Sequence, residues 1–226
     1  YVFERNGNGS WSQVEKIVSN GRFAEDEFGF SVAIASDGVA VVGAPGANDT
    51  PSGISDNGAV YVFLRNGSGN WNFSQELTAF DLAEDDQFGW SVAIDGSFIV
   101  VGAIGEDEDG STLNTLSNAG SVYIFRDLLG LNSWTTNQKI VAGDREAEDI
   151  FGSSVAIDGN RLVVGASGED DDENGNNNLN SAGSAYVFER SLSIWSQRDK
   201  LVSSDRAQGD NFGFSVGISV DLIVVG

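Results

Sequence analysis

The stretch FGFSVAIASDGVAVVGAP, residues 28–45, carries the pattern that decides the fold. It begins with a Phe-Gly pair, ends with Gly-Ala-Pro and is apolar through most of its length. Related stretches begin at Phe88, Phe151 and Phe212, so the pattern recurs about every 61 residues. Repetition at this length indicates a series of similar supersecondary units.

Each copy contains four apolar segments, which predict four strands. The first two, FGxSVxI and VVG, lie in long apolar runs such as VAVVGA, so we expect both to be buried on both faces. The fourth alternates, with Trp71, Phe73 and Leu77 expected on one face, and this predicts a half-exposed outer strand. The third segment reads YxF, and its tyrosines are Tyr1, Tyr61, Tyr123 and Tyr186. The fourth segment contains a tryptophan in each copy: Trp11, Trp71, Trp134 and Trp195.

Four-stranded antiparallel units with buried inner strands and an exposed outer strand are typical of β-propeller blades. The sequence therefore predicts an all-β protein with about four blades' worth of strands, as a small closed ring or as part of a larger ring, for example one of seven blades. We expect one domain, 1–226, with repeats at approximately 1–60, 61–122, 123–185 and 186–226. A β-sandwich is the alternative fold, but it does not explain a motif that recurs with every fourth strand.

Composition excludes several classes of function. The chain of 226 residues has a formal charge of -22, so nucleic acid is not an expected partner. No apolar stretch is long enough to cross a bilayer, so direct membrane insertion is not expected either. Histidine and cysteine are absent, which removes the usual general base and thiol nucleophile and favours a protein that is not an enzyme.

Acidic residues gather in two kinds of segment that should emerge at the same end of each blade, because successive strands alternate in direction. One is the link before each Phe-Gly pair, which reads DxxxxDxFG in three copies and has Gly21 in place of the first Asp in the other. The second is the loop after VVG, as in GEDED, residues 105–109, and GEDDDENGNNN, residues 168–178. The hairpins expected at the opposite end are nearly neutral, so the charge is polarised.

Loop carboxylates are ligands that calcium prefers, and one prediction from the sequence is therefore a calcium-binding face. The alternative is structural, because an Asp before a tight turn can accept backbone N–H bonds and hold the crossing in shape. The candidate metal ligands are Asp81, Asp86, Asp107, Asp109, Asp144, Asp149, Asp170, Asp172, Asp205 and Asp210.

The chain resembles the FG-GAP repeat family, the β-propeller repeats of integrin α-subunits and of many secreted surface proteins. Residues 28–45 contain both halves of the family motif, Phe28-Gly29 and Gly43-Ala44-Pro45. The resemblance implies an extracellular propeller for adhesion or protein binding, often with calcium. The family's DxDxDG-like calcium loop between the first two strands is absent here, and Asp-Gly pairs such as Asp95-Gly96 predict plain hairpin turns instead.

We therefore expect a non-catalytic, secreted or cell-surface adhesion propeller that binds a protein or glycan ligand at its acidic loop face. A structural component of an extracellular wall or filament is one alternative, and self-association is expected if the ring is incomplete. A carbohydrate-active enzyme that uses two carboxylates is another. Sequons at Asn8, Asn48, Asn66 and Asn72 would permit glycosylation.

Overall fold

The computed structural model describes residues 1–19, 25–48, 53, 55–109, 115–172, 174–176 and 178–226; Gly21 lies outside these ranges. The described residues form sixteen strands and no helix, so the prediction of an all-β protein is confirmed. No helix long and apolar enough to span a membrane occurs in the described ranges. The strands are β1 (Val2–Arg5), β2 (Trp11–Glu15), β3 (Ser31–Ile34), β4 (Val39–Ala44), β5 (Ala59–Arg65), β6 (Trp71–Leu77), β7 (Phe88–Asp95), β8 (Phe98–Ala103), β9 (Ser121–Asp127), β10 (Trp134–Ile140), β11 (Phe151–Asp158), β12 (Arg161–Ala166), β13 (Ser184–Ser191), β14 (Ile194–Leu201), β15 (Val216–Ser219) and β16 (Leu222–Val225).

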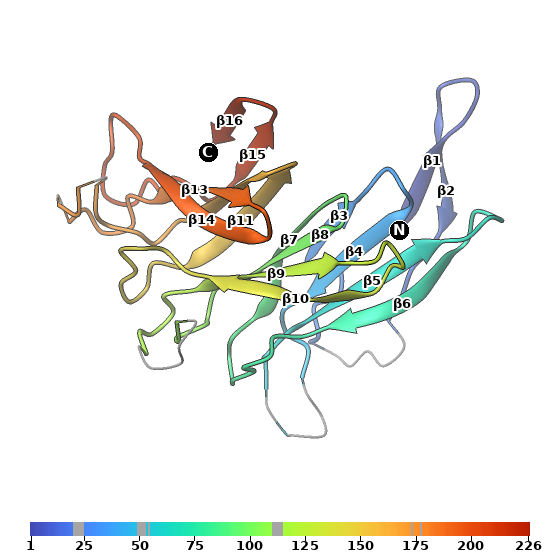
Figure 1. Ribbon diagram of the computed structural model, residues 1–226, viewed down its shortest axis with the longest axis horizontal. Helices are drawn as coiled ribbons and strands as arrows, with labels where there is room; N and C mark the ends of the chain where they lie inside the picture. Colours follow the sequence, from blue (N-terminus) through green and yellow to red (C-terminus); the bar gives the residue numbers. More distant parts are fainter. Residues whose placement is uncertain (20–24, 49–52, 54, 110–114, 173, 177) are drawn as a thin grey trace.

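The strands form three complete antiparallel blades and two half-blades. Blade A contains β3 to β6, blade B contains β7 to β10 and blade C contains β11 to β14, each in chain order. The N-terminal half-blade, β1 and β2, and the C-terminal half-blade, β15 and β16, are separate two-stranded sheets. Figure 1 shows the half-blades at opposite ends of the row of blades. The described strands thus supply four blades' worth of sheet without pairing their ends into a closed four-bladed ring.

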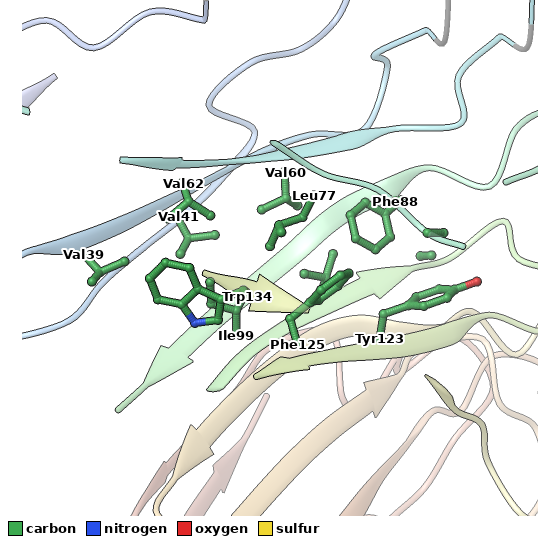
Figure 2. Packing of buried hydrophobic residues seen from close by; sticks show 13 residues of the cluster. Val39, Val41, Val60, Val62, Leu77, Phe88, Ile99, Tyr123, Phe125 and Trp134 are labelled. Carbon is green, nitrogen blue, oxygen red and sulfur yellow. The ribbon is translucent and has the colours of Figure 1, made fainter. Parts of the chain in front are cut away.

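The core lies between blades, and the middle strands of each blade supply it from both of their faces. Along β8, Ile99 and Val101 pack into the cluster shared with blade A, whereas Phe98 and Val100 pack into the cluster shared with blade C. Figure 2 shows the first of these clusters, in which Val41 and Val62 of blade A face Ile99 and Trp134 of blade B. Burial of alternate residues on opposite sides explains the continuous apolar runs.

The prediction that the first and second strands are the ones buried on both faces is correct only for the second. β8 is buried at every position, and β9 is buried at all but one of its positions. The first strand, β7, is only half-buried along most of its length. It is the terminal strand of its blade, so it lacks a neighbour on one edge, and the buried pair is instead the middle one.

The prediction that Trp71 and Leu77 share a face of the outer strand is wrong. Trp71 packs into the cluster of Tyr61 and Phe63, whereas Leu77 packs into the cluster on the opposite side of blade A. The pairing of β6 with β5 shifts between Val62 and Phe63, because Ser74 is an extra residue in the register. A β-bulge of this kind reverses the alternation beyond it. Register shifts at the same place in β10 and β14 repeat the effect.

The two halves of the repeat motif contact each other across the blade boundary. A Cβ atom on Gly102, which follows VV in blade B, would lie 2.1 Å from the carbonyl oxygen of Gly152, the glycine of the next Phe-Gly pair. Ser91 Oγ donates to that same carbonyl at 2.7 Å. Close backbone approach therefore explains why both motif positions are glycine. The pairs Gly43/Gly89 and Gly165/Gly213 have the same contact.

The outer strands of neighbouring blades are joined by a second repeated contact. Gln138 of β10 donates from Nε2 to the carbonyl of Trp195 at 2.9 Å and accepts from its backbone N–H at 2.9 Å. Gln75 bonds Trp134 of the next blade in the same way, at 2.7 and 3.0 Å. These bridges hold the otherwise exposed outer edges of adjacent blades together.

Candidate functional site: the acidic loop face

The links between blades and the loops after the second strands meet at one end of the blades, as the sequence predicts. Arg145, in the link before β11, donates to the carbonyl of Asp107 in the loop after β8 at 2.8 Å. Arg206, in the next link, donates to the carbonyl of Asp171 in the loop after β12 at 2.8 Å. We call this end the loop face: the described residues of links 78–87, 141–150 and 202–211 and of loops 45–58, 104–120 and 167–183.

The hairpins lie together at the opposite end, which we call the hairpin face. The backbone N–H of Asp127, the last residue of β9, donates to the carbonyl of Ser97 in the β7–β8 hairpin at 2.9 Å. The expected Asp-Gly turns are present, and the glycines have positive φ, for example 52° at Gly96. Charges occur on this face too, but acidic and basic side chains accompany each other, as in the pair of Arg161 and Asp221 at 2.6 Å. The acidic residues here include Glu4, Asp37, Asp95, Asp127, Asp158, Glu189 and Asp221, and the arginines are Arg5, Arg65, Arg126, Arg161 and Arg190.

The second Asp of each link holds the crossing between blades. Asp86 is buried and its Oδ2 accepts from the backbone N–H of Ala83 at 2.6 Å. Its neighbours Asp85 and Gln87 have φ of 65° and 56°, a conformation that non-glycine residues rarely adopt. Asp210 accepts from Ala207 in the same manner at 2.6 Å. The structural role predicted as the alternative to metal binding, in which the Asp accepts a backbone N–H bond, therefore applies to Oδ2 of these carboxylates.

Burial in an acidic environment shifts the ionisation of the link aspartates. Desolvation, followed by the nearby charge of Glu106, raises the pKa of Asp86 to about 7. In blade C, desolvation and then Glu169 raise the pKa of Asp149 to about 8. In both pairs, Asp86 with Glu106 and Asp149 with Glu169, burial and the neighbouring glutamate favour the protonated form of the aspartate.

A buried polar network joins the link, the loop and the outer strand of blade B. Lys139 Nζ lies 2.8 Å from Asp81 Oδ2 and 3.2 Å from Glu106 Oε2. The Tyr123 hydroxyl lies 2.7 Å from Asp81 Oδ1 and also contacts Glu106. Desolvation and these carboxylates raise the pKa of Tyr123 far above its ordinary value, so the phenol stays protonated. Lys139 offsets part of the buried negative charge, and the network ties three segments together.

Blade C repeats the network and blade A does not. Lys200 lies 2.8 Å from Asp144 and 3.2 Å from Glu169, and the Tyr186 hydroxyl donates to Glu169 at 2.5 Å. In blade A the position of the Glu is Ala47 and the position of the Lys is Glu76. The buried anion and the buried cation are thus absent together, as expected if each is tolerated only with its partner.

Two of the ten candidate metal ligands belong to a compact carboxylate cluster. Oxygen atoms of Asp149, Glu169 and Asp170 all lie within 4.8 Å of one another, the one such group found among the described residues. Sequence reasoning missed Glu169 as a ligand, although the shared Gly-Glu-Asp of 105–107 and 168–170 marks this position.

The other candidate ligands are not members of this cluster. Asp81 and Asp144 pair with lysines, and Asp86 and Asp210 accept from their own links. Asp107 accepts from the N–H of Asn118 at 2.8 Å, and Asp172 accepts from the N–H of Asn174 at 2.8 Å. Asp205 accepts from Ser203, and Asp109 is half-buried in the loop after β8. Glu173 of the acidic loop lies outside the described residues.

The architecture defines a repeat protein of the β-propeller class with four-stranded antiparallel blades and an acidic loop face. The family model described as "FG-GAP repeat" matches residues 11–63, 71–125, 134–188 and 195–226. The chain belongs to the FG-GAP repeat family, as its Phe-Gly and Gly-Ala motifs predicted.

A comparison with curated proteins found no match. Among solved structures, one that is similar is the crystal structure of Saccharomyces cerevisiae Sqt1, with 10% identity and a TM-score of 0.46. The alignment covers 81% of this chain and 37% of that one, so this chain spans a little over a third of the Sqt1 length.

Proposed function

We propose that this chain is a non-catalytic interaction propeller of the extracellular type, which engages its ligand through the loop face. The observation that carries the proposal is the unequal distribution of charge between the two ends of the blades. Exposed carboxylates at the loop face include Glu84, Asp85 and Glu146. Arg145 and Arg206 of this face donate to loop carbonyls, and the acidic residues of the same links and loops outnumber them.

An acidic face of this kind fits a basic protein surface, or a glycan bound through calcium. Complementary charge accelerates encounter and discourages wrong partners, even where its contribution to affinity is small. The same charge repels the phosphates of nucleic acid. The setting in which FG-GAP repeats commonly occur supports a secreted or cell-surface location with an adhesive role.

Two alternatives make different use of the same chain. A carbohydrate-active enzyme needs two carboxylates about 5 to 9.5 Å apart with the sugar between them. Asp149 and Glu169 are closer than this and both are buried, so they leave no room for a sugar. A structural component is favoured by the exposed apolar faces, such as Val32 at 69% and Leu222 at 75% exposure, which could pack against further sheet.

The proposal is tested with a ten-residue lysine peptide as a basic probe, in EDTA and at two salt concentrations, by biolayer interferometry. The loop-face variant Glu84→Gln/Glu146→Gln should bind at least threefold more weakly than the parent. The matched control Asp37→Asn/Asp199→Asn removes the same charge from exposed positions elsewhere and should bind as the parent does. Equal weakening by both variants would contradict a dedicated face, and turnover of aryl glycosides would favour the enzyme.

A further inference from the structure

The cluster of Asp149, Glu169 and Asp170 has the dimensions of a calcium site. Its three carboxylate oxygens lie within 4.8 Å of one another. Oxygens on opposite sides of a calcium ion are about 4.6 to 5.2 Å apart, since each lies about 2.3 to 2.6 Å from the ion. All three side chains can therefore contact one ion without moving apart.

A second, independent feature is an unpartnered oxygen on Asp149, a member of this cluster. Asp149 is 1% exposed, and its Oδ2 accepts from the backbone N–H of Glu146 at 2.5 Å. Its Oδ1 is also buried, yet no donor among the described residues bonds it. A buried carboxylate oxygen without a donor is costly and calls for a missing partner. Glu169 and Asp170 beside it contribute negative charge, which a cation would neutralise.

The equivalent place in blade B differs in both respects. Asp107, the counterpart of Asp170, already accepts a hydrogen bond from the backbone N–H of Asn118 at 2.8 Å. Asp86, the counterpart of Asp149, has no oxygen among the buried unpartnered atoms of the described chain. The unsatisfied oxygen and the compact cluster therefore occur together in blade C, which makes blade B a natural control.

We propose that Asp149, Glu169 and Asp170 bind one calcium ion on the loop face of blade C. The inference deepens the proposed function and rests on it only in assigning the ion to the same ligand-binding face. Oxygen-only donors suit a hard cation, and water completes the six to eight ligands that calcium takes. Magnesium fits less well, because it demands shorter, near-octahedral contacts and keeps most of its waters.

The surrounding contacts accommodate the ion. Lys200, the nearest cation to Glu169, has Asp144 as its closer partner at 2.8 Å and can remain there. The Tyr186 hydroxyl bonds Glu169 Oε2 and positions the carboxylate. Arg206 donates to the carbonyls of Asp170 and Asp171 at 3.1 and 2.8 Å, which fixes the loop that carries the ligand. The bound ion joins the blade B–C link to the loop of blade C.

The test is calorimetric titration of calcium chloride into EDTA-treated, dialysed protein. The parent should bind one ion with a Kd of about 0.1 to 1 mM, the range of extracellular modules. Asp149→Asn and Asp170→Asn should each weaken binding at least tenfold, whereas the matched control Asp107→Asn should not change it. Asn at position 149 keeps an acceptor for the Glu146 N–H, so this variant is expected to fold, and Asp170→Asn decides the matter if it does not.

Thermal unfolding supplies the second readout. Calcium at 5 mM should raise the Tm of the parent and of Asp107→Asn by about 2 to 5 °C and leave Asp149→Asn unshifted. Absence of both a saturable heat and a Tm shift in the parent up to 10 mM calcium overturns the proposal. So does equal affinity in all three variants, which would place the ion elsewhere. Binding of the lysine peptide in EDTA tests the loop face separately, so failure of one proposal leaves the other standing.

Discussion

Replacing Asp86 by Asn should make the protein more stable at alkaline pH. Burial and the charges of Glu106 and Asp81 raise the pKa of Asp86 to about 7, against the opposing effects of Lys139 and the Ala83 N–H. From the ordinary value of 3.8, this rise corresponds to about 4 kcal/mol at 1.36 kcal/mol per pH unit. The carboxylate form therefore costs the fold a sizeable part of its stability.

The sign follows from which state holds the proton. Between about pH 4 and pH 7 the folded protein keeps a proton on Asp86 that the unfolded chain has released, so this group's contribution falls as pH rises through the window. Above pH 7 the loss is complete. Asn remains neutral and keeps an acceptor for Ala83, so Asp86→Asn should equal the parent near pH 4 and exceed it by up to about 4 kcal/mol at pH 8.

Urea unfolding followed by tryptophan fluorescence, in EDTA from pH 4 to pH 9, measures this difference. Part of the slope should persist in the variant, because Asp149, with a pKa of about 8, titrates in the same direction. A variant that is less stable than the parent at pH 8, or whose pH slope is unchanged, would refute the reasoning that Asp86 is a buried and costly carboxylate.

Three further substitutions test the contacts between and within blades, each measured by urea unfolding. Gly102→Ala places a Cβ 2.1 Å from the Gly152 carbonyl oxygen and should lower the free energy of unfolding by about 1 to 3 kcal/mol or more. The control Gly217→Ala has nothing within 4 Å of the added Cβ and should leave stability unchanged. Equal effects of the two variants would contradict the packing argument. Lys139→Met leaves Asp81 and Glu106 buried without their cation and should lower the free energy of unfolding by about 3 to 5 kcal/mol. Adding Glu106→Gln to this variant should recover part of the loss, and additive losses would show that the groups are not coupled. Gln138→Ala removes both bonds to Trp195 and should cost about 1 to 3 kcal/mol, more than Gln197→Ala, which loses one bond to the exposed Gly143; the opposite order would argue against the bridge.

Much of the fold could be predicted because its signals are local. The recurrence of Phe-Gly and Val-Val-Gly predicted the strands, and Asp-Gly pairs predicted the turns between first and second strands. The position of Leu77 could not be predicted in this way, since the bulge at Ser74 inserts one residue without altering the apolar and polar pattern. The apolar runs also did not reveal which strand ends each blade, and this decides which pair is buried.

The candidate site was only partly predictable for a different reason. Alternating strand direction was enough to bring links and loops to one end, and so to predict an acidic face. The partners of individual carboxylates lie far along the chain: Lys139 is 58 residues from Asp81, and Tyr123 is 42 residues from it. The sequence pattern therefore counts Asp81 and Asp149 alike as candidate ligands, although one is paired with a lysine and the other has an unpartnered oxygen.

The sequence by itself determined the repeat, the strands, the hairpin turns and the concentration of acid in the links and loops, because each follows from side-chain periodicity or from the conformational preferences of neighbouring residues. Only the tertiary structure decided which carboxylates are neutralised by lysine, which accept from their own backbone and which three converge. Those outcomes depend on distances between segments that meet only when blades pack, and Coulomb and desolvation energies change steeply over such distances.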